Sequence, residues 1–286
     1  MLASVETNQR TDREFRFEKS DFDYLADLVR RNTGIVLADH KQDMVYSRLV
    51  RRLRELGLST FKSYCELLEK PGGSAELGKL INAITTNLTR FFREGHHFEH
   101  LAQTTRAHLA KTRGRSRFRI WSAGCSSGEE PYSIAMTMGE HCEALRYHDF
   151  RILASDLDTD MVARGSAGRY MLKDADGLSK GQVTRWTTPV RGTGEIQMKP
   201  ALREMIVFKQ LNLLGPWPMR GKFNVIFCRN VMIYFDGPTK ARLLERYHDA
   251  LVPGGWLYIG HSETILEQRH LFEPMGKTIY RKAGPC

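Results

Sequence analysis

Short apolar stretches alternate with amphipathic ones after residue 117, and this alternation constrains the fold more than any other feature of the sequence. The expected strands cover residues 118–124, 150–156, 204–210, 223–230 and 254–260. Apolar runs of this length are typical of strands that are buried on both faces of a parallel sheet. Helices fit between most of them, notably over 129–141 and 238–251, and a last strand over 276–283 is expected to pair antiparallel at or near the edge. The pattern predicts an α/β fold with a doubly wound, mostly parallel sheet.

Other parts of the chain depart from this alternation. Residues 1–19 carry alternating charges and few apolar anchors, which predicts a flexible tail. Residues 20–95 are expected to form an all-helical domain, because apolar residues recur there at helical spacing. Residues 96–286 would then form the α/β domain. Within it, residues at about 168–203 exceed the length of an ordinary connection and are expected to leave the sheet as an insertion.

The formal net charge of +10 indicates an acidic partner, which could be nucleic acid, an anionic membrane or an acidic protein surface. The charge is concentrated in two stretches. Residues 28–62 hold eight Lys and Arg against three Asp and Glu, and residues 90–119 hold eight against two.

Cysteine usage and hydropathy predict where the protein works. The five cysteines are scattered and contain no C-x-x-C pair, which favours reduced thiols and gives no reason to expect a metal site. No apolar run approaches the roughly 20 residues of a membrane span, and the first residues lack the apolar core of a signal peptide. We therefore expect a cytoplasmic protein with no direct membrane insertion.

Polar residues follow the predicted strands at the edge where doubly wound sheets bind their ligands. The first strand ends in Gly124 and a turn to Gly128, the second is followed by Asp156 and Asp158, and the third by Asn212. Any one Asp or Asn at such a position is equally expected to cap the next helix. Their occurrence at several strand ends together favours a ligand site.

The turn after the first strand leads directly into two carboxylates, Glu129 and Glu130. It lacks both G-x-G-x-x-G and G-x-x-x-x-G-K-[ST], and two carboxylates would repel a phosphate there. Asp156 ends the second strand, where an acidic residue bonds the ribose of a bound nucleoside. A nucleoside with a cationic amino-acid tail fits both features, and S-adenosylmethionine is such a ligand. A pair of glutamates at a helix start is also an ordinary complement to the helix dipole.

Several longer motifs resemble those of the CheR family, the chemotaxis receptor glutamate methyltransferases. They are TTNLTRFFRE (85–94), WSAGCSSGEEPYSIAM (121–136), ASDLDTDMV (154–162), FCRNVMIYF (227–235) and GGWLYIGHSE (254–263). The sequence over 34–58 resembles the helical domain of these enzymes, so the likeness covers about residues 20–283 in the right order.

The resemblance implies a Rossmann-like, S-adenosylmethionine-dependent methyltransferase sheet. It also implies that the domain over 20–95 recognises the receptor and that the insertion at 168–203 is a small β-subdomain. The implied activity is that of a protein-glutamate O-methyltransferase. Such an enzyme transfers the methyl of S-adenosylmethionine to glutamates on the cytoplasmic methylation helices of chemoreceptors. The products are glutamyl methyl esters, used in sensory adaptation, and S-adenosylhomocysteine.

The resemblance also assigns residues to the site. Those expected to contact the cofactor are Asn87, Thr89, Arg93, Glu130, Asp156, Asn212, Leu213, Arg229 and Asn230. Glu130 would take the methionine ammonium and Asp156 the ribose hydroxyls, while Arg93 and Tyr234 would handle the acceptor carboxylate as catalytic residues. No general base is expected, because a glutamate with a pKa near 4.3 is already ionised at pH 7.

Three arginines share one face of the helix expected between Asp39 and Leu56. Arg48, Arg51 and Arg52 stand at the i, i+3 and i+4 spacing that brings side chains together. Taken with the resemblance, this predicts a substrate-binding surface for the acidic receptor helices. The alternative is a merely solvated face.

Two other functions would account for parts of the sequence. A nucleic-acid methyltransferase would explain the basic charge, but NVMIY (230–234) lacks the prolines of the [DNS]-P-P-[YFW] motif, so we expect no nucleic-acid partner. A cofactor-binding adaptor without activity is disfavoured by the presence of Arg93 and Tyr234. The segment after RGTG (191–194) is short for a receptor-tail dock, which favours untethered recognition, and we expect a monomer.

Overall fold

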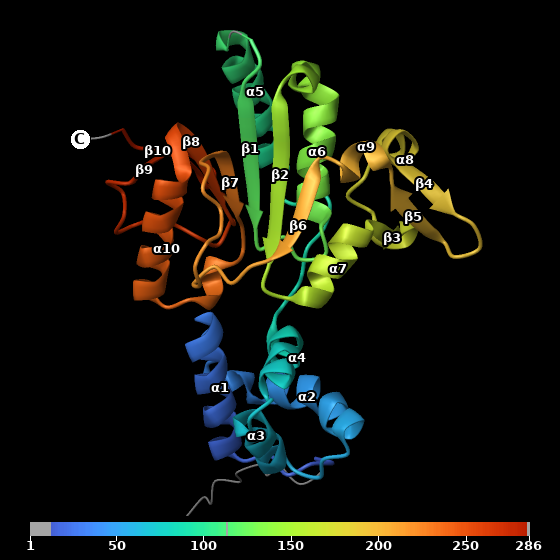
Figure 1. The fold of residues 1–286 in the computed structure, drawn as a ribbon, viewed down its shortest axis with the longest axis vertical. Helices are drawn as coiled ribbons and strands as arrows, with labels where there is room; N and C mark the ends of the chain where they lie inside the picture. The colour runs from blue at the N-terminus through green and yellow to red at the C-terminus, as the bar shows by residue number, and fades with distance from the viewer. Residues whose placement is uncertain (1–12, 113, 285–286) are drawn as a thin grey trace, which may run out of the picture. The chain divides into compact units, whose positions relative to one another are not determined.

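A computed structural model describes residues 13–112 and 114–284 (Figure 1), and the chain divides into two compact units between Thr85 and Thr86. The sequence placed this boundary at residue 95. It lies earlier because the segment 86–95 is bonded to the second unit: the Ser126 hydroxyl donates to the Asn87 carbonyl at 3.0 Å, and the Phe92 amide donates to the Ser133 hydroxyl at 2.9 Å.

The first unit is helical, as predicted. Its helices are α1 (Lys19–Thr33), α2 (Gln42–Leu56), α3 (Phe61–Glu69) and α4 (Ser74–Ile84), with the short 3-10 helix η1 (Asp39–Lys41) before α2. Gly34 and Gly57 end α1 and α2 in the left-handed conformation that glycine adopts most readily. The apolar stripes of the helices meet in one core that includes Phe22, Leu25, Val29, Val45, Leu49, Leu53, Phe61, Tyr64, Leu80 and Ile84.

The flexible tail predicted for residues 1–19 needs correction where the structure describes it. Phe15 is buried in the helical core, and the ring of Phe17 lies 4.3 Å from that of Phe61. Arg16, between the two phenylalanines, forms a backbone bridge with Thr60. Two aromatic anchors therefore tie residues 13–18 to the unit. Residues 1–12 lie outside the described residues.

The second unit is built on a seven-stranded sheet of order β6-β2-β1-β7-β8-β10-β9 (Figure 1). Its strands are β1 (Arg117–Ala123), β2 (Asp149–Asp156), β6 (Ile206–Gln210), β7 (Phe223–Cys228), β8 (Leu251–Ile259), β9 (Phe272–Pro274) and β10 (Ile279–Lys282). The first five of these pair in parallel, while β10 is antiparallel to both β8 and β9. The predicted doubly wound fold and the antiparallel strand near the edge are confirmed.

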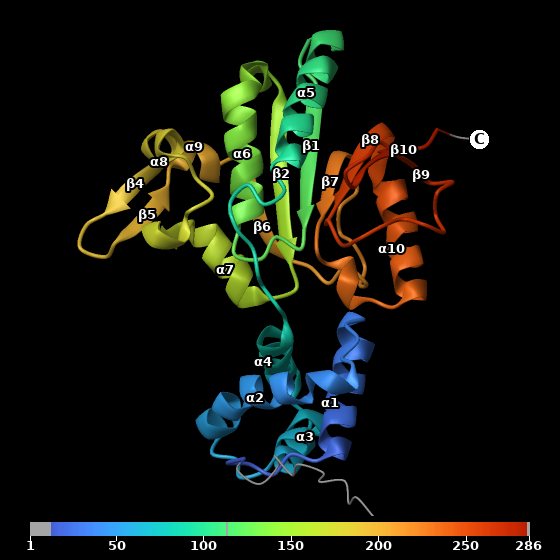
Figure 2. The same cartoon turned by 180° about the vertical axis from the view of Figure 1, so that it is seen from behind.

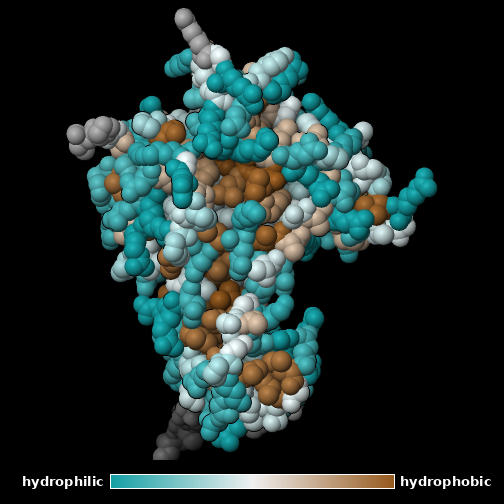
Figure 3. Space-filling model, in the orientation of Figure 1, coloured by the Kyte–Doolittle hydropathy of each residue, from teal (hydrophilic) through white to brown (hydrophobic). Residues whose placement is uncertain are grey.

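Helices cover the sheet unequally. On one face lie α5 (His96–Lys111), α6 (Glu129–His141) and α7 (Thr159–Ala167) (Figure 2), and on the other lies α10 (Gly237–Ala250). The connection from β6 to β7 contains no helix, and Trp217 from this connection packs edge-on against Trp121 of β1. Hydrophobic surface is visible on this side of the sheet (Figure 3). Val207 of β6 is 42% exposed.

The insertion after α7 forms a sheet of its own, with strand order β3-β5-β4. Its elements are β3 (Arg169–Met171), the 3-10 helix η3 (Leu172–Asp174), α8 (Lys180–Trp186), β4 (Thr187–Val190), β5 (Glu195–Met198) and α9 (Pro200–Arg203). Two further 3-10 helices, η2 (Glu143–Tyr147) and η4 (Met232–Tyr234), follow α6 and β7. Among the described helices, none has the length and hydropathy needed to cross a membrane.

Candidate functional site

The strand order reverses between β1 and β7, since β2 and β6 extend the sheet in one direction while β8 and β10 extend it in the other. Ligands of doubly wound sheets bind at the carboxyl ends of the strands beside such a point. The turn from Gly124 to Gly128 follows β1 here, and Arg229 and Asn230 follow β7. The sequence-predicted residues of these two segments therefore stand at one edge of the sheet.

Two glycines shape the turn between β1 and α6. Gly124 and Gly128 have φ angles of 91° and 100°, which L side chains rarely adopt. A Cβ on Gly128 would lie 2.9 Å from the Cα of Gly165, and one on Gly124 would lie 2.3 Å from Val231. Both positions therefore need glycine for its conformation and for its size.

Asp156 ends β2 and holds this turn in place. Its Oδ2 accepts the Ser126 amide at 2.7 Å, and its Oδ1 accepts the Asp158 amide at 3.0 Å. Burial raises the pKa of the Asp156 carboxyl. Each carboxylate oxygen has two lone pairs, so the side chain keeps acceptor capacity for the hydroxyls of a ligand.

Asp158 takes the capping role that was equally expected for these acidic residues. Its Oδ1 accepts the amides of Asp160 and Met161 at the start of α7. Its Oδ2 accepts the side-chain amide of Asn87 at 2.8 Å. The cap thus also orients a residue that was predicted to contact the cofactor.

Arg229 lies between the carboxylates of Glu130, which is buried, and Glu94, whose side chain is 13% exposed. Its Nη1 is 3.2 Å from Glu130 Oε2, its Nη2 is 3.4 Å from Glu94 Oε2, and its side chain is only 3% exposed. The Ser122 hydroxyl donates to Glu130 Oε1 at 2.7 Å. Burial raises the pKa of Glu130, and the charge of Arg229 opposes this shift. With both carboxylates ionised the trio carries a net charge of −1, which favours a cation at its edge.

Glu129 is separated from this trio although it adjoins Glu130 in the sequence. Its Oε2 accepts the Ser127 hydroxyl at 2.7 Å, and burial raises the pKa of its carboxyl. The two glutamates at the start of α6 therefore have different surroundings, which their spacing alone did not predict.

The segment that precedes α5 brings Asn87, Thr89 and Arg93 to the same unit. Phe92 and Glu94 have positive φ angles of 52° and 56°, which is uncommon for residues other than glycine. The Arg93 side chain is 31% exposed, and its Nη1 donates to the Leu88 carbonyl at 3.0 Å. The Arg93 carbonyl accepts a hydrogen bond from Arg229 Nη2, so this strained segment is tied to the end of β7.

Glu263 organises the loop after β7, and the sequence analysis missed it. Its Oε2 accepts the amides of Asn230 and Gly260, at 2.9 and 2.6 Å, and its Oε1 accepts the amide of Ile233 at 3.2 Å. These bonds hold Asn230 at a φ of 59° and fix η4, which ends at the half-buried Tyr234. The signal was its place at the end of the GGWLYIGHSE motif.

Asn212 and Leu213 follow β6. The Asn212 side-chain oxygen accepts the Leu214 amide at 2.9 Å, and Leu213 is buried.

The three arginines predicted to form a receptor-binding face differ in their surroundings. Arg51 has an 86% exposed side chain and pairs with Glu55 at 2.8 Å. Arg48 is half-buried and donates to the carbonyls of Ile84 and Thr85, at 2.6 and 2.7 Å, at the end of α4. Arg52 is 26% exposed and pairs with Glu76. Within the helical unit, Arg48 and Arg52 have contacts that their spacing did not reveal.

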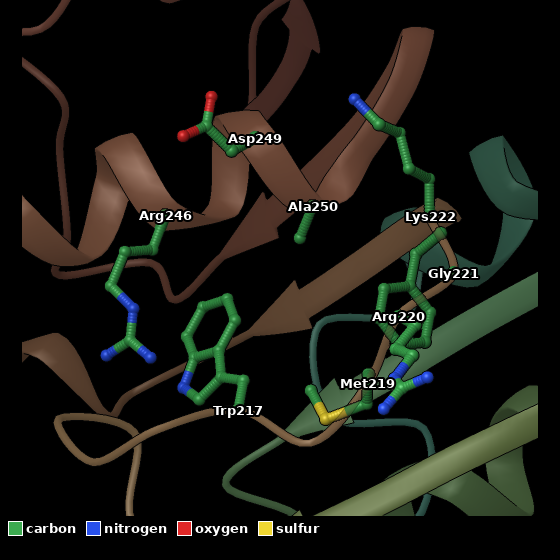
Figure 4. Close-up of a pocket in the computed structure, with 9 residues that line it drawn as sticks. Trp217, Met219, Arg220, Gly221, Lys222, Arg246, Asp249 and Ala250 are labelled. Atoms are coloured by element: carbon green, nitrogen blue, oxygen red, sulfur yellow. The ribbon is translucent and has the colours of Figure 1, made fainter.

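A hollow of about 360 Å³ lies elsewhere on the second unit (Figure 4). It is lined by Trp217, Arg220, Lys222, Phe223 at the start of β7 and Ala250 at the end of α10. It therefore stands at the amino end of β7, away from the carboxyl ends of the strands. In Figure 4 the side chains of Arg220 and Lys222 point apart and do not converge on a ligand.

The described residues contain no group of three or more His, Cys, Asp and Glu that could hold a metal ion. The carboxylates near the strand ends fit a nucleoside with a cationic amino-acid end. Asp156 offers acceptors for hydroxyls, and the pair of Glu94 and Glu130 exceeds the charge of Arg229. Glu94 Oε2 is shielded from water and makes no hydrogen bond, although Arg229 Nη2 lies 3.4 Å away.

Comparisons with known proteins give the same family for both units. The family model for the "CheR methyltransferase, SAM binding domain" matches residues 87–281, and the model for the "CheR methyltransferase, all-alpha domain" matches residues 20–85. The chain is 43% identical to a probable chemotaxis protein methyltransferase of Rhizobium etli, over 89% of this chain and 96% of that protein. It is 42% identical to the chemotaxis protein methyltransferase of Escherichia coli, over 91% of this chain and 89% of that protein.

Proposed function

Because the chain belongs to the CheR family of methyltransferases, we propose that it methylates glutamate side chains on the cytoplasmic methylation helices of chemoreceptors. Family membership confirms the resemblance drawn from the sequence motifs. It makes the chain an S-adenosylmethionine-dependent methyltransferase of chemotaxis. The identity of the acceptor, the roles of the individual residues and action as a monomer are parts of the proposal.

The observation that carries the proposal is the trio of Glu94, Arg229 and Glu130 beside a glycine turn. Its net charge of −1 suits the ammonium of a methionine group, and a phosphate there would be repelled. Glu130 receives the ammonium and Asp156 receives the ribose hydroxyls. The remaining contacts come from Asn87, Thr89, Arg93, Asn212, Leu213, Arg229 and Asn230.

When bound, S-adenosylmethionine supplies a methyl group that its sulfonium has already activated. The protein's task is to orient the acceptor carboxylate in line with that methyl and to remove water from it. The Arg93 guanidinium, 31% exposed, fixes one carboxylate oxygen, and Tyr234 positions the other or packs beside the methyl. No side chain needs to remove a proton, since the carboxylate is ionised at pH 7.

The receptor helices meet the helical unit through its basic surface. The sequence assigned Arg48, Arg51 and Arg52 to this surface, and Arg51, with its 86% exposed side chain, is best placed to meet a glutamate-bearing helix. Exposed charges of this kind mainly raise the rate of encounter.

The test follows a labelled methyl group. Cofactor carrying a tritiated methyl is incubated with chemoreceptor membranes or with duplex DNA, and the products are then treated with alkali. We expect label on the receptors that alkali releases as methanol, because glutamyl esters hydrolyse under these conditions. Label on DNA, or receptor label that resists alkali, would contradict the proposal.

A pair of variants locates the acceptor site. Arg93→Ala should depress transfer severely even at saturating cofactor, because the carboxylate loses its orientation. Arg90→Ala, which removes an exposed arginine three residues away, is the matched control and should transfer at the rate of the unmodified enzyme. Equal rates in the two variants would remove Arg93 from catalysis.

A further inference from the structure

His97 lies beside Glu94 at the edge of the proposed site, and no role assigned so far uses this histidine. The His97 ring is fully buried, and its Nδ1 lies 3.5 Å from Glu94 Oε2. Neither atom has a hydrogen-bond partner, although both are shielded from water. Buried polar atoms nearly always have a hydrogen-bond partner. Two buried polar atoms that face each other without forming a hydrogen bond therefore need a physical explanation.

The two carboxylate oxygens of Glu94 contact two different loops. Oε1 accepts the amide of His261 at 3.2 Å, just after β8, while Oε2 lies 3.4 Å from Arg229 Nη2 at the end of β7. Glu94 itself has a φ of 56°. A residue in this uncommon conformation persists only where its surroundings hold it. Glu94 therefore fixes Arg229, which in turn reaches Glu130.

The other ring nitrogen of His97, Nε2, also has close neighbours. Its Nε2 lies 3.1 Å from the Thr278 hydroxyl and 3.1 Å from the Lys277 carbonyl, and His96 Nε2 lies 3.0 Å from the same carbonyl. The Thr278 hydroxyl lies 2.7 Å from the Lys277 carbonyl, to which it can donate. Because His96 can also donate to this carbonyl, the hydroxyl can instead turn and donate to His97 Nε2. In that arrangement His97 carries its proton on Nδ1, directed at Glu94.

The imidazole is neutral in this setting. Burial, together with the positive charge of Arg229, lowers the pKa of His97 to about 3. A neutral ring adds no charge to the trio of Glu94, Arg229 and Glu130, so the trio keeps its net charge of −1. A charged ring would cancel it.

We propose that Glu94 supplies the second carboxylate of the cofactor's ammonium site and that His97, through Nδ1–H, is a positioning residue that holds it there. The inference rests on the proposed cofactor site and deepens it. The approach of 3.5 Å is longer than a full hydrogen bond, and such contacts commonly tighten once a ligand is bound.

Two ligands that differ only at the amino-acid end can distinguish a role of Glu94 in binding the ammonium from a purely structural role. S-adenosylhomocysteine carries the ammonium, whereas 5′-methylthioadenosine has the same nucleoside and thioether but no amino-acid end. Glu94→Gln keeps the size of the side chain and removes its charge. Calorimetry should show binding of S-adenosylhomocysteine weakened by about tenfold to hundredfold, with binding of methylthioadenosine unchanged.

His97 is tested with two amides of different reach. The side-chain nitrogen of His97→Asn falls near the position of Nδ1 and can still donate to Glu94, whereas that of His97→Gln falls near Nε2. We expect the asparagine variant to retain the preference for S-adenosylhomocysteine over methylthioadenosine and the glutamine variant to lose most of it. Nitrogen-15 spectra of the ligand-free protein, assigned by difference with His97→Asn, should report the Nδ1–H tautomer.

The outcomes are distinct. Equal weakening of both ligands in Glu94→Gln, or no weakening at all, overturns the role of Glu94, and an Nε2–H tautomer overturns that of His97. If the unmodified protein binds neither ligand, the proposed cofactor site itself fails.

Discussion

Arg52 donates two hydrogen bonds to Glu76, one to each carboxylate oxygen, at 2.7 and 2.5 Å. The Tyr64 hydroxyl donates to the same carboxylate at 2.9 Å, so the pair joins α2, α3 and α4. Glu76 is buried, and its charge is compensated chiefly by this arginine. An arginine that sequence spacing placed on a binding face thus belongs to the interior contacts of the helical unit.

Arg52→Ala is therefore expected to destabilise the helical unit. The change leaves a buried carboxylate without its charged partner, which should cost about 1.5–3 kcal/mol in the free energy of unfolding. Urea unfolding followed by circular dichroism measures the loss. Arg51→Ala, at a position 86% exposed, serves as the control and should stay within about 0.5 kcal/mol of the unmodified protein.

The exposed arginine of the same helix tests receptor recognition without this complication. Arg51→Glu should lower the initial rate of receptor methylation about two- to fivefold at low salt, because the reversed charge repels acidic helices. The deficit should shrink at high salt, where such charges are screened. Arg269→Glu makes the same charge change at an exposed position in the second unit and should methylate normally. Equal rates for the two variants would show that the face around Arg51 is merely solvated.

The glycine turn can be tested for conformation and size separately. Gly128→Ala places a Cβ at a φ of 100° and within 2.9 Å of the backbone of Gly165, so we expect a loss of about 2–4 kcal/mol in unfolding free energy. Gly192 has a φ of 75° and no heavy atom within 4 Å of an added Cβ. Gly192→Ala should therefore show only the conformational cost, about 1–2 kcal/mol. Similar losses in both would mean that the close approach to Gly165 relaxes without cost.

The central strands of the second unit were predictable because their apolar runs are largely buried. The strand expected at 118–124 is β1, at Arg117–Ala123, and the one expected at 150–156 is β2, at Asp149–Asp156. The boundary of the helical unit was misplaced because residues 86–95 were assigned by their position in the chain. Their hydrogen bonds to the turn and to α6 join segments distant in sequence, which local periodicity does not report.

The site residues that stand at strand ends were predictable from the sequence. The residues that act through contacts with distant segments of the chain were not. Asp156 and Arg229 follow buried strands, a position that itself indicates a ligand edge. Glu94 and Glu263 act through contacts with residues well separated in the chain, His261 for Glu94 and Asn230 for Glu263. Only the folded chain shows these contacts.

Asp156→Asn tests the ribose contact. The amide keeps the shape of the side chain but replaces one acceptor oxygen with a donor, which must face the backbone amide of either Ser126 or Asp158. One acceptor fewer is then left for the ribose hydroxyls. The affinity for S-adenosylhomocysteine, measured by calorimetry, should fall by about 1.5–3 kcal/mol. Unchanged affinity would remove Asp156 from the site. A methylthioadenosine titration should show the same loss, since the ribose is common to both ligands.

Glu129→Gln tests how the burial of this carboxyl makes the stability of the protein depend on pH. Burial raises the pKa of Glu129 above its usual value of 4.5, so near pH 7 the ionised carboxylate opposes folding. As the pH falls through the raised pKa, the folded protein takes up this proton before the unfolded chain does, and this opposition is progressively relieved. The neutral amide carries no such dependence. Glu129→Gln should therefore gain stability relative to the unmodified protein near pH 7, and this gain should diminish as the pH approaches 4.5. Chemical unfolding of both proteins across this range measures the difference, and a gain that grows on acidification would contradict a raised pKa at Glu129.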